Sequence, residues 1–342
     1  MNDFYRLAPP EQGARLERLA VAALRHWKIQ PAGLSLLKLR ENAVFQVRAV
    51  DDARYVIRVH RAGYHTDAEL QSEMWWMAAL DAASVRTPVF LPACDGSPFK
   101  TVSVPDVPEP RQVDLCEWID GHTLGTVAGG LSDAVTDAAT VHRLVGETMA
   151  RVHTQAVSWD VPAGFTRHAW DTEGLVGEQP FWGRFWELER LSDEQRRVTL
   201  EARAKLREDL TRFGRGSDRY SLIHADFLPE NLLVVPEGVR LIDFDDCGFG
   251  WHMFDVATAV FFQAGEAAFD TVLEALVDGY RSVRPLPDAH LALLPAFLAA
   301  RATTYLGWVH TRWETETARQ LSAVLVGPLV ALLAQYVLQP AA

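Results

Sequence analysis

The chain has 342 residues, which exceeds one typical domain and predicts two lobes. A formal net charge of -12 argues against a nucleic-acid binder, because such proteins present a basic face. The hydrophobic content of 49% and the charged content of 23% are ordinary for a globular enzyme. Cys94, Cys116 and Cys247 are widely spaced and form no metal-binding pattern, so we expect free thiols in a reducing compartment. With no signal organisation at the N-terminus, a cytoplasmic protein is predicted.

The first part of the chain shows three strand patterns between two helical patterns, and two further strand patterns after the second helix. Asp51-Asp52 joins two of the strands and is a hairpin turn signal. Thr66 with Glu69 three residues later is a capping box, which predicts the start of a helix. We therefore expect a small antiparallel sheet with strands at 34–39, 44–50, 55–60, 99–104 and 112–119, and helices at 11–27 and 66–83.

The rest of the chain is mostly helical in pattern, which predicts an α+β fold with a larger helical C-terminal lobe. We place a nucleotide-binding lobe at 1–119 and a catalytic and substrate-binding lobe at 120–342. The expected helices of the second lobe cover 140–155, 181–213, 252–263, 270–280, 289–308 and 314–338.

The apolar run 321–338 is close in length to a membrane-spanning helix. Gly327-Pro328 interrupts it, Ser322 and Gln335 dilute it, and no basic cluster flanks it. We predict a kinked helix buried in the core and no membrane partner.

The run from Ser221 to Asp246 contains the pattern His-x-Asp-x-x-x-x-Asn, a hydrophobic pair and Asp-Phe, carried by His224, Asp226, Asn231 and Asp243. This pattern is typical of a phosphoryl-transfer catalytic loop and its metal-binding strand. Asp226 would accept the proton of an attacking hydroxyl. The oxygens of Asn231 and Asp243 are the kind that Mg²⁺ prefers while it bridges ATP phosphates.

The residues between Asn231 and Asp243 predict a β-hairpin. Leu232 to Val235 forms one strand pattern, 236–238 is a turn signal, and 239–242 returns as a second strand. Asn231 enters one arm of this hairpin and Asp243 leaves the other, so the two side chains are expected to lie close together.

With this layout, the chain resembles the aminoglycoside phosphotransferase and choline kinase-like family of the protein-kinase-like fold, in the branch of homoserine kinase type II and bacterial stress-response kinases. The resemblance rests on 222–231, on 242–246 and on Phe254-Asp255-Val-Ala. It implies that Asp255 and His224 support the catalytic loop structurally. It also implies that Asn42, in a loop that is not Gly-rich, covers the nucleotide phosphates, and that Glu117 and Ile119 lie in the segment that contacts adenine.

The strand 55–60 departs from the kinase pattern, because Arg58 stands where kinases place the phosphate-binding Lys. Arg can bind phosphate oxygens in a bidentate fork and stays charged. We expect Arg58 to contact the nucleotide phosphates with Glu73 as its partner, and Glu69 as the second choice; a surface ion pair is the alternative.

The acceptor is expected against Asp226, with Asp245, Asp246, Trp251 and Trp182 as candidate substrate residues. Aromatic faces and spare carboxylates would hold an ammonium group. Aromatic residues at helical spacing are more often part of a core, which is the alternative for each of them. Further candidates are His252, Phe181, Phe185, Trp186, Tyr305, Trp308, His310 and Trp313.

The leading hypothesis is an ATP- and Mg²⁺-dependent kinase that phosphorylates a hydroxyl of a small, amine-bearing substrate such as an amino alcohol, hydroxy amino acid or amino sugar. A Ser/Thr protein kinase is the first alternative, but only twelve positions separate Asp243 from Asp255, which leaves no room for a long activation segment. A nucleotide-binding pseudokinase is the second alternative, supported by Arg58 alone.

Overall fold

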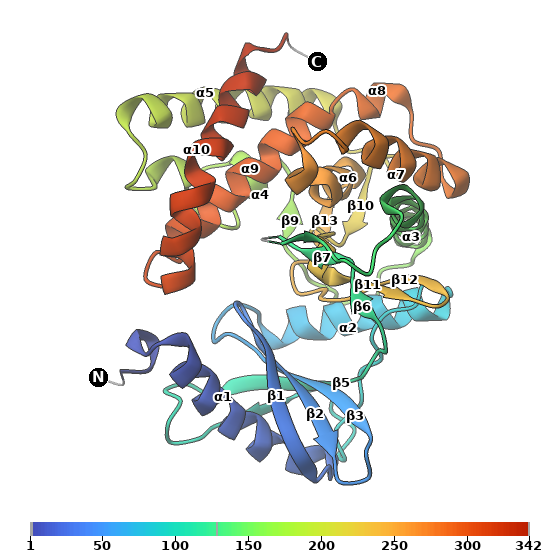
Figure 1. Ribbon diagram of the computed structural model, residues 1–342, viewed down its shortest axis with the longest axis vertical. Helices are drawn as coiled ribbons and strands as arrows, with labels where there is room; N and C mark the ends of the chain where they lie inside the picture. The colour runs from blue at the N-terminus through green and yellow to red at the C-terminus, as the bar shows by residue number, and fades with distance from the viewer. Residues whose placement is uncertain (1–2, 128, 341–342) are drawn as a thin grey trace. The chain divides into compact units, whose positions relative to one another are not determined.

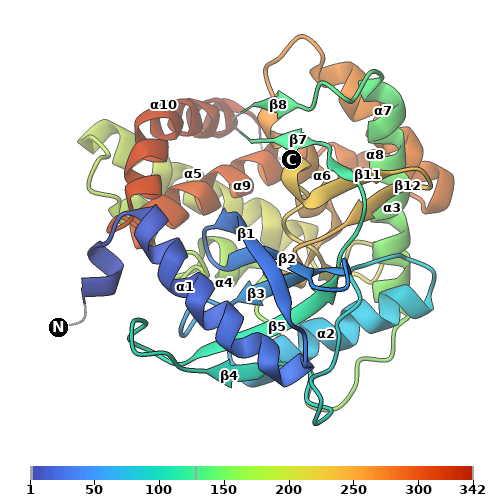
Figure 2. The same cartoon turned by 60° about the horizontal axis from the view of Figure 1, so that its bottom comes forward.

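The structure is a computed structural model that describes residues 3–127 and 129–340 (Figures 1 and 2). The chain forms two compact units. The first contains residues up to 82, 86–120 and 161–166, and the second contains 83–85, 121–160 and the residues from 167 onward. The sequence pattern placed the division at 119 and did not foresee that 161–166 belongs to the first unit.

The first unit is built on a five-stranded sheet in the order β1-β2-β3-β5-β4, and all of its strand pairs are antiparallel. Asp51 and Asp52 lie in the turn between β2 and β3, as the hairpin signal predicted. The strands are β1 (Pro31–Leu39), β2 (Ala43–Ala49), β3 (Arg54–Val59), β4 (Lys100–Val102) and β5 (Arg111–Glu117).

Two helices accompany this sheet. Helix α1 (Pro9–Leu24) lies against one face, where its apolar side chains form a core with Ile57 and Val59 of β3 (Figure 2). Because side chains alternate along a strand, Arg58 points to the opposite face, where it meets Glu73 of α2 (Asp67–Ala82). Thr66 and Glu69 form the predicted capping box at the start of α2.

The second unit is mainly helical (Figure 1). Helix α3 packs along α7, and α9 packs against α6 and α10. Its α-helices are α3 (Ala138–Ser158), α4 (Thr172–Val176), α5 (Asp193–Phe213), α6 (His252–Val260), α7 (Phe269–Val283), α8 (Asp288–Leu291), α9 (Leu294–Thr311) and α10 (Glu316–Leu338).

Short sheets in the second unit position the motif residues. β10 (Tyr220–Ile223) pairs with β13 (Gly248–Trp251), which also pairs with β9 (Ala169–Trp170). β11 (Leu232–Val235) and β12 (Gly238–Leu241) form the predicted hairpin, and β6 (His122–Thr123) adds to β11. The remaining pair is β7 (Gly125–Thr126) with β8 (Gly130–Leu131).

The expected helix at 181–213 is wrong in its first part. Residues 185–187 form a single 3-10 turn, and α5 begins only at Asp193, where Ser192 and Gln195 make a capping box. Gly183 has a φ of 101°, a conformation that ends any helical path there. Trp182 and Trp186 therefore do not share one helix face.

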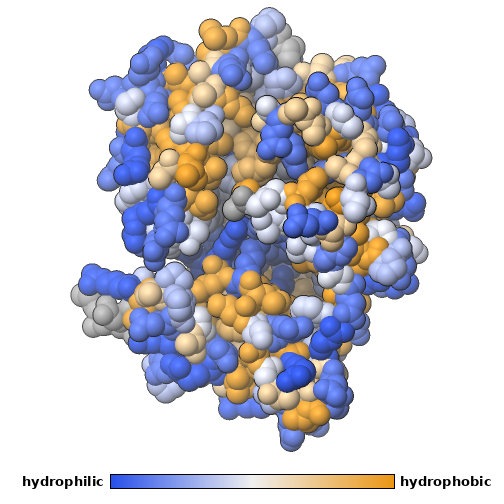
Figure 3. All heavy atoms as spheres, in the orientation of Figure 1, coloured by the Kyte–Doolittle hydropathy of each residue, from blue (hydrophilic) through white to orange (hydrophobic). Residues whose placement is uncertain are grey.

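Helix α10 is long and apolar enough to cross a membrane by length and composition, but a single helix of this kind is weak evidence. One third of its apolar window is buried, so the predicted burial holds on one side only. Each unit also carries apolar side chains on its surface (Figure 3). In α10, Val324 is 64% exposed, and in β1 of the first unit, Leu37 is 51% exposed.

Candidate active site

The catalytic-loop motif lies between two strands of the second unit. β10 ends at Ile223, the loop carries Asp226, and a 3-10 turn at Pro229–Asn231 leads directly into β11. The Leu228 N–H donates to the Asp226 carbonyl oxygen at 2.7 Å, which closes the loop on itself. The strand ends therefore fix both ends of the segment, and the internal bond fixes its middle.

Asn231 lies against Asp226. The amide Nδ2 of Asn231 donates to Asp226 Oδ2 at 2.7 Å and to the Asp226 carbonyl oxygen at 3.0 Å. Because both contacts use the side-chain nitrogen of Asn231, the side-chain oxygen Oδ1 is the atom suited to bind a cation. The side chain thus orients the carboxylate with one end and can serve a metal ion with the other.

The hairpin brings the two candidate metal ligands to neighbouring positions. Leu232 pairs with Leu241, and the Ile242 N–H donates to the Asn231 carbonyl oxygen at 2.9 Å. Asp243 follows directly and has a φ of 65°, which turns the chain sharply after β12.

A carbonyl oxygen and a carboxylate at adjacent positions fit Mg²⁺, which keeps most of its sites for water and phosphate oxygens. No cluster of three or more His, Cys, Asp or Glu side chains suited to a metal ion occurs among residues 3–127 and 129–340. Two protein ligands are enough for a metal ion that arrives with a nucleotide, so the site fits a metal held jointly with phosphates.

Asp255 of α6 holds the start of the catalytic loop. Its carboxylate accepts from the His224 N–H at 3.1 Å and from the Ala225 N–H at 2.7 Å. Burial raises the pKa of Asp255 to about 7, against the effect of these donors. The geometry is that of a structural support, the role implied by the family resemblance.

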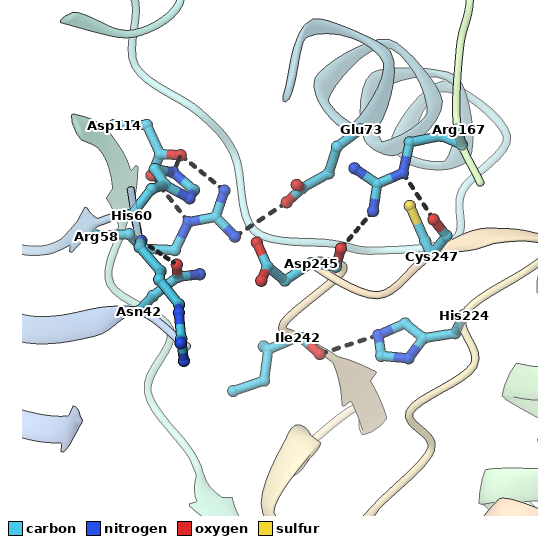
Figure 4. A network of polar contacts seen from close by, with 11 residues as sticks. Asn42, Arg58, His60, Glu73, Asp114, Arg167, His224, Ile242, Asp245 and Cys247 are labelled. Carbon is cyan, nitrogen blue, oxygen red and sulfur yellow. Dashed lines mark hydrogen bonds and ion pairs between the residues drawn. The ribbon is translucent and has the colours of Figure 1, made fainter. Parts of the chain in front are cut away.

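His224 is neutral and bridges two parts of the motif. Its Nε2 donates to the Ile242 carbonyl oxygen at 3.1 Å (Figure 4). Its Nδ1 accepts from the Asp226 N–H at 3.2 Å. Complete burial lowers the pKa of His224, which agrees with this single-proton arrangement. The imidazole therefore ties the loop to the metal-ligand hairpin.

The turn after Asp243 is anchored through its backbone. Arg167 Nε donates to the Cys247 carbonyl oxygen at 2.6 Å and the same side chain also contacts the Asp245 carbonyl oxygen (Figure 4). Trp170 Nε1 donates to the Asp246 carbonyl oxygen at 2.8 Å. The side chains of Asp245 and Asp246 are both buried, at 4% and 8% exposure, so neither is an open surface carboxylate.

Five of the candidate aromatic residues lie in the core, namely Trp182, Phe185, Trp186, Trp251 and His252. Trp251 is fully buried and donates through Nε1 to the Gly214 carbonyl oxygen at 2.6 Å, so it is a core residue and does not line an open surface. His252 contacts Ser221 Oγ through Nε2 at 2.8 Å and stacks on His153.

The ring of Trp182 faces two protein cations. The guanidinium of Arg301 lies 5.4 Å from the ring centroid and that of Arg312 lies 5.9 Å from it. Part of the aromatic surface expected to hold a substrate cation thus already contacts arginine.

The sequence pattern did not single out Arg301, which contacts Asp226 directly. Its Nη2 donates to Asp226 Oδ1 at 2.6 Å, and its side chain is fully buried in α9. One signal could have revealed it: Arg301 is the only Asp, Glu, Lys or Arg between positions 289 and 311. A lone charge in an apolar helix requires a buried partner.

In the first unit, Arg58 lies between two carboxylates (Figure 4). Its Nε and Nη2 bind Asp114 at 2.9 and 2.7 Å in a bidentate pair, and its Nη1 donates to Glu73 Oε1 at 2.9 Å. Glu73, the first choice of partner, makes the contact, and Glu69 remains in the cap of α2. The three contacts use three of the five guanidinium N–H groups, so at most two remain for phosphate.

Asp114 was also missed by the sequence pattern. It lies directly opposite Arg58 in the β3–β5 register, and its Oδ2 contacts His60 Nε2 at 2.7 Å. The positive charge of Arg58 and the contact with His60 lower the pKa of Asp114 against the effect of burial. Two carboxylates around one guanidinium weaken its attraction for phosphate relative to an unpaired Lys.

The other nucleotide candidates lie at the ends of strands in the first unit. Asn42 is in the turn between β1 and β2, and its Oδ1 accepts from the Arg61 N–H at 3.3 Å. Glu117 is the last residue of β5, its N–H donates to the Val89 carbonyl oxygen at 3.0 Å, and Ile119 follows two residues later. Their contacts with nucleotide remain predictions.

The antiparallel sheet with its helix, the helical unit and the Asp226-Asn231-Asp243 hairpin define the protein as a phosphotransferase of the protein-kinase-like fold. The chain belongs to the phosphotransferase enzyme family, whose model matches residues 35–293. The predicted fold class and enzyme class are therefore confirmed.

The relatives include small-molecule kinases. The chain is 34% identical to a microcompartment-associated aminopropanol kinase of known structure, with a TM-score of 0.82 and coverage of 94% of this chain and 97% of that one. It is 31% identical to an uncharacterized protein of Deinococcus radiodurans, over 84% of this chain and 80% of that protein. It is 21% identical to an amicoumacin kinase of Bacillus subtilis, over 81% and 80%.

Proposed function

We propose that this protein transfers the γ-phosphate of ATP to a hydroxyl of a small, amine-bearing acceptor, and that amino alcohols such as 1-amino-2-propanol are the first class to test. The observation that carries the proposal is the Asp226 carboxylate, with Oδ2 bound by Asn231 and Oδ1 bound by Arg301. The similarity to an aminopropanol kinase over nearly the whole chain supports the acceptor class. We expect the enzyme to act in the cytoplasm.

Asp226 receives the acceptor. Each of its oxygens has one protein donor, and a carboxylate oxygen can accept two hydrogen bonds, so each retains a position for the acceptor hydroxyl. As the hydroxyl oxygen forms its bond to the γ-phosphorus, the bond to the bridging oxygen breaks, ADP leaves, and the hydroxyl proton passes to Asp226.

Asn231 and Asp243 would hold Mg²⁺, which when bound neutralises charge on the phosphates. In the first unit, Arg58 would contact phosphate oxygens with its remaining N–H groups while Glu73 and Asp114 hold it in place. Asn42 would cover the phosphates, and Glu117 and Ile119 would contact adenine.

The acceptor's ammonium group is proposed to interact with the carboxylates of Asp245 and Asp246. Asp245 and Asp246 follow the metal ligand Asp243 closely, and their backbone is fixed by Arg167 and Trp170. Trp182 is retained as an acceptor contact only through the part of its surface that the two arginines do not cover. The high negative net charge of the chain also favours a cationic substrate.

The pseudokinase alternative rests on Arg58, and the arrangement of Asp226 weakens it. A module that only binds nucleotide has no use for a carboxylate oriented by an amide and a guanidinium. The short segment between Asp243 and Asp255, which holds β13, argues against a peptide acceptor.

The test is a panel of acceptors with Mg-ATP, followed by detection of ADP and of the phosphorylated product by ³¹P NMR. The panel contains 1-amino-2-propanol, ethanolamine, choline, homoserine and an aminoglycoside. We expect turnover with an amino alcohol and a phosphate-ester product. Turnover with the aminoglycoside or homoserine alone would contradict the proposed class, and label transfer to protein alone would favour the protein-kinase alternative.

A further inference from the structure

Arg301 lies at the centre of a set of contacts with the catalytic loop. Nη1 donates to the Ala225 carbonyl oxygen at 3.1 Å, and Nη2 donates to Asp226 Oδ1 at 2.6 Å and to the Tyr305 hydroxyl oxygen at 3.1 Å. The guanidinium also lies over the rings of Trp182, Phe254 and Tyr305, at 5.4, 5.7 and 4.6 Å from their centroids.

The backbone at this point is strained. Ala225 has a φ of 64°, a conformation that is disfavoured for any residue with a Cβ. Asp255 holds the N–H of Ala225 at 2.7 Å, and Arg301 holds its carbonyl oxygen at 3.1 Å. The peptide groups that set the direction of the Asp226 side chain are thus held from α6 on one side and from α9 on the other.

We propose that Arg301 is a positioning residue for phosphoryl transfer, which holds the Asp226 carboxylate in one orientation so that the acceptor hydroxyl meets a fixed oxygen. This inference rests on the proposed kinase function. With Asn231 on Oδ2 and Arg301 on Oδ1, rotation of the carboxylate would break two charge-assisted bonds at once. Arg301 itself is fully buried and acts through Asp226.

The energetics favour this role over a purely structural one. Burial of a charged side chain carries a large desolvation cost, and a hydrophobic residue of similar volume would serve packing as well or better. Arg301 Nε, moreover, has no hydrogen-bond partner among the described residues, an arrangement that packing alone would not select. The guanidinium is retained where its fork reaches both the strained peptide and the reacting carboxylate.

The test is a double-mutant cycle with Arg301→Gln, Asp226→Asn and the double variant. In the parent, Arg301→Gln is expected to lower kcat about 100-fold, since misplacement of a reacting group by about 1 Å has this cost, while KM for ATP changes less than about three-fold. In the Asp226→Asn background the same substitution should change kcat less than about three-fold, because the oriented carboxylate is already gone.

Arg203 provides a matched control. It donates to the Val176 and Gly177 carbonyl oxygens and to Glu178, and its guanidinium lies 4.0 Å from the Trp186 ring centroid, so it has the same kinds of partner on α5. Arg203→Gln should lower the melting temperature and leave kcat within about two-fold of the parent. Equal kcat losses from Arg203→Gln and Arg301→Gln would overturn the proposal.

If Arg301→Gln lowers kcat by the same factor in the parent and in the Asp226→Asn variant, the proposal is also overturned. If Arg301→Gln does not fold, Arg301→Lys, which keeps the charge, is taken through the same cycle with the same criteria. Should the parent fail to phosphorylate 1-amino-2-propanol, the cycle is run on slow transfer from Mg-ATP to water. If the effects of Arg301→Gln and Asp226→Asn on transfer to water are coupled, the role of Arg301 is supported although the proposed acceptor has failed. If the parent transfers phosphate neither to 1-amino-2-propanol nor to water, both proposals are overturned.

Discussion

Two buried arginines, one in each unit, differ in what surrounds them. Arg58 in the sheet contacts two carboxylates, those of Glu73 and Asp114. Arg301 in the helical unit contacts the single carboxylate of Asp226 together with a carbonyl oxygen and a phenol. Arg58 therefore has two carboxylate partners, whereas Arg301 has one.

The difference shows two uses of one side chain. Around Arg58, the two carboxylates hold the guanidinium in place and reduce its attraction for phosphate. Binding of nucleotide would therefore depend on the N–H groups of Arg58 that Glu73 and Asp114 do not use. Around Arg301, the guanidinium holds the carboxylate in place. The predictions below separate these two roles.

The largest effect is expected at Asp226. Asp226→Asn removes the group that accepts the acceptor's proton, and the transfer rate should fall about 10³-fold. Steady-state ADP release with 1-amino-2-propanol is the measurement. Asp278→Asn, at a 61% exposed carboxylate on α7, is the matched control and should retain the parent rate. A rate within a few-fold of the parent in Asp226→Asn would contradict the assignment.

Asp114→Asn is expected to destabilise the first unit. It leaves Arg58 with one carboxylate, and removal of one partner from a buried pair costs about 3–5 kcal/mol. Denaturant unfolding measures the loss. An unchanged midpoint would show that the pair of Arg58 and Asp114 does not hold the sheet. Asp106→Asn, which breaks the exposed pair with Arg18, should cost about 1 kcal/mol or less.

Asp243→Asn should raise the Mg²⁺ concentration for half-maximal activity by about ten-fold, because a neutral oxygen binds a hard cation more weakly than a carboxylate does. The measurement is a Mg²⁺ titration at saturating ATP. Asn231→Ala should show the same direction and, in addition, a lower kcat, because it also removes a donor to Asp226. Identical Mg²⁺ curves for Asp243→Asn and the parent would remove Asp243 from the metal site.

The smallest effect is a loss of stability in acid. Burial lowers the pKa of His153, His224 and His252. Below about pH 6.5 these side chains are therefore protonated more readily in the unfolded chain than in the folded chain. Stability should therefore fall as the pH falls below about 6.5. Asp255, with its pKa raised to about 7, offsets one of the three, since the folded form takes up a proton there first.

Melting temperatures at pH 7.5 and 5.5 measure this effect. We expect the lower value at pH 5.5 and a smaller difference in His252→Gln, which removes one resisting group. A melting temperature that rises on acidification would show that Asp255 dominates the histidines.

Local patterns predicted much of the fold. Alternation and turn residues predicted the strands of the sheet and the hairpin after Asn231, because side-chain period and turn chemistry act over a few residues. The spacing of Asp226, Asn231 and Asp243 likewise predicted neighbouring positions that the paired strands explain. These features depend on contacts between residues close in the chain.

The rest required tertiary contacts. Asp114 meets Arg58 only through the register of β3 and β5, 56 positions apart, and Arg301 meets Asp226 across 75 positions. No local period encodes either pair. The single helix predicted over 181–213 is wrong for a different reason. Gly183 has a positive φ and Ser192 caps a new helix, and these two local features override the helical spacing of the apolar residues around them.

The most direct test is to measure kcat and KM for ATP in Arg58→Lys and Arg301→Gln side by side. The contrast predicts that Arg58→Lys raises KM for ATP about ten-fold with kcat nearly unchanged, because a point charge cannot keep the bidentate pair with Asp114 and also serve phosphate. It predicts that Arg301→Gln lowers kcat with KM for ATP nearly unchanged. If both variants change the same parameter, the two arginines do not divide binding and transfer between them.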